Sequence, residues 1–126
     1  MAFFLEKPKT ESTPYVLVDE EKSYMLFEGM SFHENAVVFY NEIKEWLGGY
    51  VETDFSLFTF DCKLTYSNSS TSKILYDLLM LMDDHVTPDK RMVVNWHVGK
   101  EDEMLIELCE DIQEDYENLE VNLIMT

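Results

Sequence analysis

The feature that most constrains the fold is a regular alternation of strand and helix patterns in the second half of the chain. Alternating apolar residues predict a long strand over 55–66, and shorter β-rich runs predict strands over 92–98 and 121–125. Between them, apolar residues at helical spacing predict helices that contain 74–82 and 101–114. Strands separated by helices pair in parallel through right-handed crossovers, so this half predicts a largely parallel sheet.

The first half predicts a hairpin followed by one helix. Runs at 15–18 and 24–27 are rich in β-forming residues, flank a polar break, and the second is expected to end at Gly29. Asn35 is suited to cap the helix that follows, and the glycines at 48–49 are expected to end it. The inner faces of the first and third helices are expected to carry Val38, Phe39, Ile43, Trp46 and Leu47, and Met104, Leu105, Leu108, Cys109 and Ile112.

The expected element order is therefore ββαβαβαβ. It predicts an α/β sandwich in which helices pack on one mixed, mostly parallel sheet. At 126 residues the chain predicts a single domain over 1–126. Residues 1–13 carry turn formers and no periodic apolar face, so they are expected to be a loose N-terminal lead-in.

The charge balance restricts the classes of partner. The chain has 26 Asp and Glu residues against 9 Lys and Arg residues, for a formal net charge of −17. Such a surface repels nucleic acids and anionic membranes, so we expect neither as a partner, and it favours proteins with a basic surface. Without a membrane-spanning stretch or a basic leader, the sequence predicts a cytoplasmic protein. Cys62 and Cys109 lie outside any CxxC spacing and are expected to be buried thiols.

The richest candidate site is the junction between the long strand and the helix after it. It reads Tyr66-Ser67-Asn68-Ser69-Ser70-Thr71-Ser72-Lys73, and five of these eight residues are Ser or Thr. Unpaired backbone N–H groups and the helix dipole stabilise an anion at a helix N-terminus, so a phosphoryl group on one of these hydroxyls would be held there. Ordinary helix capping by Asn and Ser accounts for the same residue types, so both interpretations stay open at this point.

Other polar clusters point to structure rather than to chemistry. Residues 83–85 (Asp-Asp-His), with His97 or Asp61 as distant partners, lack metal-ligand spacing and are expected to be a solvated helix end. His97 lies in an apolar strand and is expected to be hydrogen-bonded within the sheet. The carboxylates of 101–120 are expected to be a solvated face, or else a docking surface for a basic partner. Because no known catalytic motif is present, we expect no enzyme, no cofactor and no metal.

An ordered set of short motifs resembles the SiaC family of bacterial regulatory phosphoproteins. The resemblance covers residues 12–115, and its motifs are Ser12-Thr13-Pro14, Ser31-Phe32-His33-Glu34-Asn35, the helix around Trp46, Leu64–Lys73, Trp96-His97 and Glu107-Leu108-Cys109-Glu110-Asp111. Two motifs depart from the family pattern. Residues 68–71 read Asn-Ser-Ser-Thr where the family usually has Asn-Thr-Ser-Ser, and residues 31–35 lack the usual Tyr-Pro.

The resemblance implies a fold similar to anti-sigma-factor antagonist (STAS) domains and a partner switch controlled by phosphorylation. A Ser/Thr kinase would add the phosphate, and a PP2C-type phosphatase would remove it. The unphosphorylated protein would bind and activate an output protein such as a diguanylate cyclase, which promotes biofilm formation through cyclic di-GMP. The family acceptor position matches Ser69, with Ser70 and Thr71 as alternatives, and partner contacts are expected at Tyr66, Asn68, Ser69, Ser70 and Lys73.

The alternative function is a constitutive acidic adaptor of the same fold that is never phosphorylated. A phosphate adds about −1.5 to −2 charge, which changes a total of −17 only slightly. A phosphorylation switch on this chain must therefore act locally, at an interface around the acceptor, and phosphate on Ser69 distinguishes the two functions.

Overall fold

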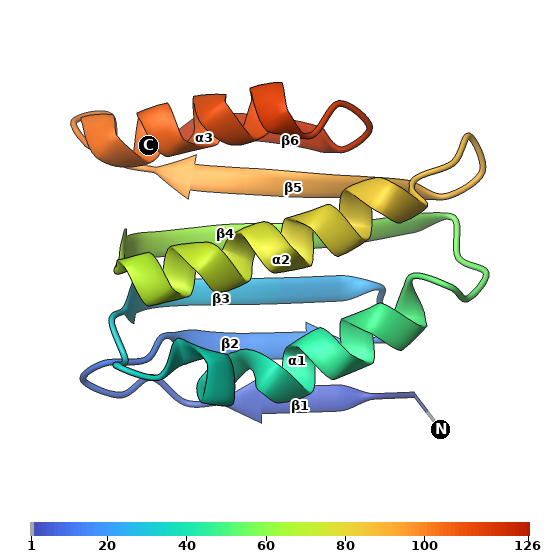
Figure 1. Cartoon of the computed structure of the whole chain (residues 1–126), viewed down its shortest axis with the longest axis horizontal. Helices are drawn as coiled ribbons and strands as arrows, with labels where there is room; N and C mark the ends of the chain where they lie inside the picture. Colours follow the sequence, from blue (N-terminus) through green and yellow to red (C-terminus); the bar gives the residue numbers. More distant parts are fainter. Residues whose placement is uncertain (1) are drawn as a thin grey trace.

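The computed structural model describes residues 2–126, and within them six strands form one mixed sheet. The strands lie side by side in chain order and are β1 (Phe4–Lys7), β2 (Tyr15–Asp19), β3 (Tyr24–Ser31), β4 (Leu57–Ser67), β5 (Arg91–Val98) and β6 (Glu120–Met125). β1, β2 and β3 pair antiparallel, whereas β3 to β6 pair parallel (Figure 1). The predicted hairpin and the predicted mixed, mostly parallel sheet are both confirmed.

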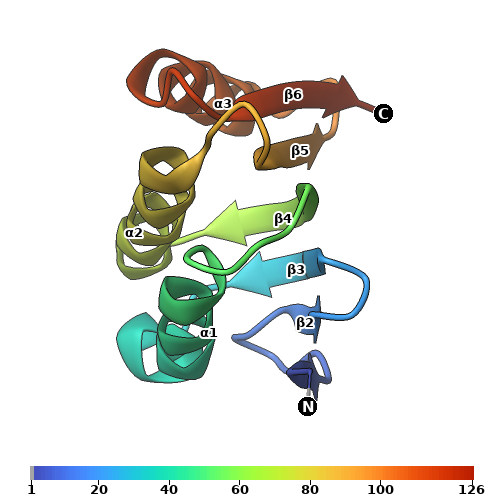
Figure 2. The same ribbon diagram turned by 90° about the vertical axis from the view of Figure 1, so that its right-hand side faces the viewer.

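Helices connect the parallel strands and all lie on one face of the sheet (Figure 2). They are α1 (Ala36–Tyr50) after β3, α2 (Ser69–His85) after β4 and α3 (Glu103–Asp115) after β5. Because each helix returns across the sheet, the carboxyl ends of β3, β4 and β5 meet the N-termini of all three helices at one end of the molecule. We call this end the carboxyl edge; it lies on the left in Figure 1.

The core lies between the helices and the sheet face that they cover. Every second residue of β4 points into it, and Phe58, Phe60, Cys62 and Leu64 are all buried, as the alternation predicts. α2 contributes a broad apolar stripe of buried residues, namely Ile74, Leu75, Leu78, Leu79 and Met82. The opposite face of the sheet is not covered by any helix of the described residues (Figure 2).

The prediction of a loose lead-in over 1–13 is wrong at Phe4–Lys7, which forms β1 and pairs with β2. Leu5 lies opposite Val18 on the helix side of the sheet, and Phe3 stacks on Trp46 with ring centroids 5.4 Å apart. Burial of these apolar side chains offsets the conformational entropy lost when the strand becomes ordered. The strand is too short to show an alternation of apolar and polar residues in the sequence. The element order is therefore βββαβαβαβ instead of ββαβαβαβ.

α1 differs from its prediction at one residue of the inner face and in length, whereas Ile43 and Leu47 are buried as predicted. Asn35 caps it as predicted, because its Oδ1 accepts a hydrogen bond of 3.4 Å from the N–H of Val38. Val38, however, is 68% exposed, since the buried positions are Ala36, Tyr40, Ile43, Leu47 and Tyr50. The helix also continues through the glycines at 48–49, where burial of Tyr50 stabilises a last turn that glycine alone would disfavour.

Two further expectations fail for local reasons. β3 continues past Gly29, which has a φ of 120° and lies at a shift in register that is typical of a β-bulge. Met104 is 82% exposed, because Leu105 and the residues four and seven positions later, Cys109 and Ile112, take the inner face of α3.

Both cysteines are buried free thiols, as predicted. Burial raises the pKa of Cys62 to about 12 and that of Cys109 to about 11, so both stay protonated at neutral pH. Across residues 2–126, none of the helices combines the length and the hydrophobicity needed to cross a membrane.

Candidate functional site

The predicted site residues lie at the carboxyl edge, where β4 ends and α2 begins. Asn68 has an extended backbone and caps α2, because its Oδ1 accepts a hydrogen bond of 2.9 Å from the N–H of Thr71. Its Nδ2 donates to the carbonyl of His33 at 3.3 Å, and its own N–H donates to the carbonyl of Ser31 at 3.1 Å. The capping interpretation is confirmed for Asn68, which also joins the start of α2 to the end of β3.

The three candidate phosphate acceptors differ in exposure. Ser69 is exposed and Ser70 is half-buried, whereas Thr71 is fully buried. Lys73 follows Ser69 by one helical turn and is also exposed. Of the ion pairs formed by residues 2–126, none involves Lys73. The junction therefore presents one exposed serine and one nearby cation to solvent.

A buried cluster of hydroxyl groups lies beneath this exposed surface. Ser31 Oγ is 2.8 Å from Tyr40 OH and 2.8 Å from Thr71 Oγ1, and Thr71 Oγ1 also donates to the carbonyl of Ser31 at 3.2 Å. Burial raises the pKa of the Tyr40 phenol well above its ordinary value, so the group stays protonated. The cluster ties together β3, α1 and α2 at the point where the candidate acceptors begin.

Exposed apolar side chains surround the junction. Phe32 and Tyr66 are 39% and 51% exposed and pack edge to face with ring centroids 6.2 Å apart. Met30 is the register partner of Tyr66, and Met104 lines a cavity of about 360 Å³ together with Tyr66, Ser67 and Ser72. We call Met30, Phe32, Tyr66 and Met104 the apolar edge surface. Contiguous exposed apolar side chains of this kind mark interaction sites.

The sequence predicted only Tyr66 among these four residues as a partner contact. Phe32 lies in the motif at 31–35 but carried no local sign of exposure, and Met104 was assigned to the core. Their proximity depends on the parallel sheet, which brings the ends of β3, β4 and β5 to one edge. The acidic face of α3 borders the same cavity through Asp102, Glu107 and Asp111.

A separate polar network occupies the uncovered face of the sheet. Asp61 accepts hydrogen bonds from Tyr24 OH at 2.6 Å and from Asn95 Nδ2 at 3.0 Å, and His97 Nε2 lies 3.3 Å from its Oδ1. Burial disfavours the carboxylate, but the hydrogen bonds outweigh burial and lower the pKa of Asp61. The prediction of His97 as a hydrogen-bonded sheet residue is confirmed. Within residues 2–126, no three His, Cys, Asp or Glu side chains cluster as metal ligands.

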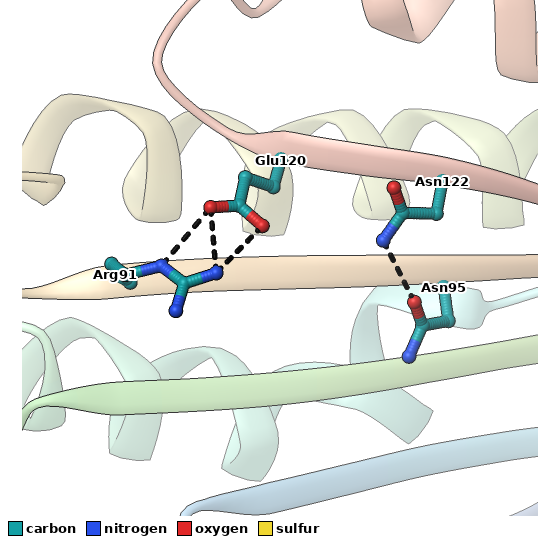
Figure 3. A network of polar contacts seen from close by, with 4 residues as sticks. All are labelled: Arg91, Asn95, Glu120 and Asn122. Carbon is teal, nitrogen blue, oxygen red and sulfur yellow. Dashed lines mark hydrogen bonds and ion pairs between the residues drawn. The ribbon is translucent and has the colours of Figure 1, made fainter.

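The network continues toward the edge of the sheet (Figure 3). Asn122 Nδ2 on β6 donates to Asn95 Oδ1 on β5 at 3.1 Å, and Arg91 binds the carboxylate of Glu120 at 2.8 Å. Both members of that ion pair are about half exposed, so screening by solvent keeps its contribution to stability small. These contacts join β5 to β6.

Residues 83–85 form a helix end that anchors the last connection. Asp83 Oδ1 accepts hydrogen bonds from the N–H groups of Asn118 at 2.9 Å and Leu119 at 3.1 Å. His85 Nδ1 lies 2.8 Å from the carbonyl of Leu81. Asp83 therefore satisfies backbone groups of the connection between α3 and β6, and His85 contacts the last turn of α2.

Comparisons with known proteins give the same fold and a family. Solved structures similar to this chain include SiaC of Pseudomonas aeruginosa, with a TM-score of 0.88 and 22% identity over 98% of this chain and 99% of that one. A chain in the crystal structure of the diguanylate cyclase SiaD in complex with its activator SiaC, from the same organism, has a TM-score of 0.89 and 24% identity over 97% and 99%. These similarities confirm the predicted α/β fold.

The sequence comparisons cover almost the whole chain. An uncharacterised protein of Pseudomonas aeruginosa strain UCBPP-PA14 is 26% identical over 111 residues, which are 88% of each chain. The family model described as SiaC family regulatory phosphoprotein matches residues 7–126. The predicted resemblance is thereby confirmed, and the chain belongs to the SiaC family of regulatory phosphoproteins.

Proposed function

We propose that this protein is a non-enzymatic partner switch that binds and regulates an output protein until Ser69 is phosphorylated. Membership of a family of regulatory phosphoproteins supports control by phosphate. The related SiaC is the activator of the diguanylate cyclase SiaD and was solved in complex with it, which supports a cyclase of cyclic di-GMP signalling as the output class. The switch operates in the cytoplasm and controls biofilm formation.

Two other proteins carry out the chemistry at Ser69. A Ser/Thr kinase transfers the terminal phosphoryl group of ATP to Ser69 Oγ; the hydroxyl proton leaves to a base of the kinase, and ADP is released. A PP2C-type phosphatase then transfers the phosphoryl group to water, which restores the hydroxyl and releases inorganic phosphate. This chain contributes only the acceptor and the surface that both enzymes recognise.

The observation that carries the proposal is the position of Ser69 beside the apolar edge surface. Its exposed hydroxyl begins α2 and directly follows the segment that contains Tyr66. The N-terminus of α2 and Lys73 favour a dianion here. A partner that covers Tyr66 and Phe32 would have to remove water from that dianion. The free energy needed for this desolvation is far larger than the free energy gained from an apolar contact. Phosphorylation therefore weakens binding without any large change in fold.

The first experiment measures the phosphate directly. The protein is purified from its native host, its intact mass is measured, and fragmentation locates any added phosphoryl group, which we expect on Ser69. Binding of purified Ser69→Ala and Ser69→Glu to a diguanylate cyclase of the same organism is then compared. We expect Ser69→Ala to bind like the unphosphorylated protein and Ser69→Glu at least tenfold more weakly. Equal binding by the two variants overturns the switch.

A matched control uses an exposed serine at the other end of the molecule. Ser56 precedes β4 at the end opposite the carboxyl edge and is exposed. Ser56→Glu adds the same charge to the same overall field, so it should leave cyclase binding unchanged. A loss equal to that of Ser69→Glu would show that total charge, and not the site, controls binding.

The second candidate function is a constitutive adaptor. The apolar edge surface favours it in one respect, because Tyr66 and Phe32 are exposed without any modification. An adaptor would carry no phosphate under any growth condition and would bind its partner equally as Ser69→Ala and wild type.

A further inference from the structure

The four hydroxyl-bearing residues at 69–72 differ in burial. Ser69 is exposed and Ser70 is half-buried. Thr71 is fully buried, and Ser72 Oγ lies 3.3 Å from Ser67 Oγ. Successive residues of an α-helix are rotated by about 100°, so residues two positions apart point to nearly opposite sides. Because the side chain of Thr71 is held toward the core, the side chain of Ser69 points toward solvent.

The hydrogen bonds of Thr71 fix that orientation. Each hydroxyl group has one proton to donate. Thr71 Oγ1 donates to the carbonyl of Ser31, so Ser31 Oγ supplies the proton between the two hydroxyls, and Tyr40 OH donates to Ser31 Oγ. All three protons are used in one directed chain. Since the cluster is buried, leaving any member unpaired would be costly.

The backbone around Thr71 is held from the same side. The N–H of Thr71 is capped by Asn68 Oδ1, and the N–H of Asn68 donates to the carbonyl of Ser31, which also accepts from Thr71 Oγ1. The end of β3 thus holds both the residue before Ser69 and the residue two positions after it. Ser69 lies between these two held residues and is itself exposed.

We propose that Thr71 is a positioning residue, whose buried hydroxyl locks the first turn of α2 to β3 and thereby makes Ser69 the hydroxyl of this run that a kinase engages. This inference rests on the proposed function, because it explains which residue the switch uses. It also excludes Thr71 as a phosphate acceptor in the folded protein, since its hydroxyl oxygen is buried and hydrogen-bonded to Ser31.

Two substitutions of Thr71 test the lock. Thr71→Val keeps the branched shape and removes the hydroxyl, whereas Thr71→Ser restores it. We expect amide hydrogen exchange at Ser72, whose N–H bonds the carbonyl of Asn68 at 2.9 Å, to become at least tenfold faster in Thr71→Val. Exchange in Thr71→Ser should stay within threefold of wild type. Wild-type exchange at Ser72 in Thr71→Val overturns the lock, whatever the phosphorylation state.

The second readout is the position of phosphate in protein from the native host. We expect phosphate occupancy of Ser69 to fall at least threefold in Thr71→Val, with a gain at Ser70, and to recover in Thr71→Ser. Unchanged occupancy in Thr71→Val, or phosphate on Thr71 in the wild type, contradicts the positioning role. Wild-type protein without any phosphate overturns the proposed function instead, while the exchange measurement still decides whether the lock exists.

A control variant separates positioning from general loss of stability. Tyr50 OH donates to Ser23 Oγ at 2.8 Å, a contact between two hydroxyls at the opposite end of α1. Tyr50→Phe removes one hydroxyl group, as Thr71→Val does, but far from the carboxyl edge. It should leave both the amide exchange rate at Ser72 and the phosphate occupancy of Ser69 unchanged. If Tyr50→Phe changed both as much as Thr71→Val does, the role of Thr71 would be purely structural.

Discussion

Tyr24 donates a hydrogen bond of 2.6 Å to the Asp61 carboxylate between β3 and β4, on the face of the sheet that no described helix covers. Burial alone would raise the pKa of Asp61, but the hydrogen bonds from Tyr24, Asn95 and His97 lower it instead. A folded-state pKa below the unfolded one means that the ionised group stabilises the fold above about pH 4. That stabilisation is lost as the pH falls through the folded-state pKa.

Asp61→Asn tests this linkage. We expect the free energy of unfolding at pH 7 to fall by about 1 kcal/mol, because a charged hydrogen-bond acceptor becomes a neutral one. As the pH falls through the folded-state pKa and Asp61 of the wild type takes up a proton, the two proteins should converge. Urea unfolding at pH 7 and through the acid range measures the difference. Glu120→Gln is the control, since its exposed ion pair with Arg91 should matter little at either pH, and an Asp61→Asn difference that persists unchanged in acid would contradict the linkage.

The packing of the short strand β1 predicts an effect of substitutions on stability that a disordered lead-in would not show. Leu5 is half-buried against the helix side of the sheet, whereas its neighbour Phe4 points to the uncovered face and is 60% exposed. Leu5→Ala should lower the free energy of unfolding by about 1–2 kcal/mol, and Phe4→Ala by much less. Chemical denaturation of both variants measures the contrast. Two equally harmless substitutions would indicate that residues 4–7 do not pack on the core in solution.

The apolar edge surface is expected to supply the binding energy of the output complex. Tyr66→Ala and Phe32→Ala each remove half of the exposed aromatic pair and should weaken cyclase binding by about tenfold or more. Phe4→Ala removes an aromatic ring that is even more exposed, on the uncovered face of the sheet, and should leave binding unchanged. Calorimetric titration with the unphosphorylated proteins gives the three affinities. If Phe4→Ala weakens binding as much as Tyr66→Ala, the interface lies on the uncovered face instead.

The sequence predicted the features that depend on local patterns. Alternation over β4 and the apolar stripe of α2 gave the sheet and its main helix, and the Asn-Ser-Ser-Thr run gave the position of the candidate site. β1 was missed because four residues are too few for a recognisable period and form a strand only by pairing with β2. Contacts between distant parts of the chain could not be predicted from local patterns either. Ser31 and Thr71 are 40 positions apart, and the sequence near one residue does not indicate a contact with the other.

The last prediction concerns Asn68, the N-cap of α2. Asn68 accepts a hydrogen bond from the N–H of Thr71 and donates another, longer one to the carbonyl of His33. Asn68→Ala loses both and should lower the free energy of unfolding by about 1 kcal/mol, or the melting temperature by about 2–6 °C. Asn68→Asp keeps the acceptor for Thr71 and adds a charge that the helix dipole favours, so it should lose less than half as much. Thermal unfolding followed by circular dichroism measures both variants at pH 7. Equal losses would mean that the bond to His33, which aspartate cannot donate, contributes more to stability than the cap itself.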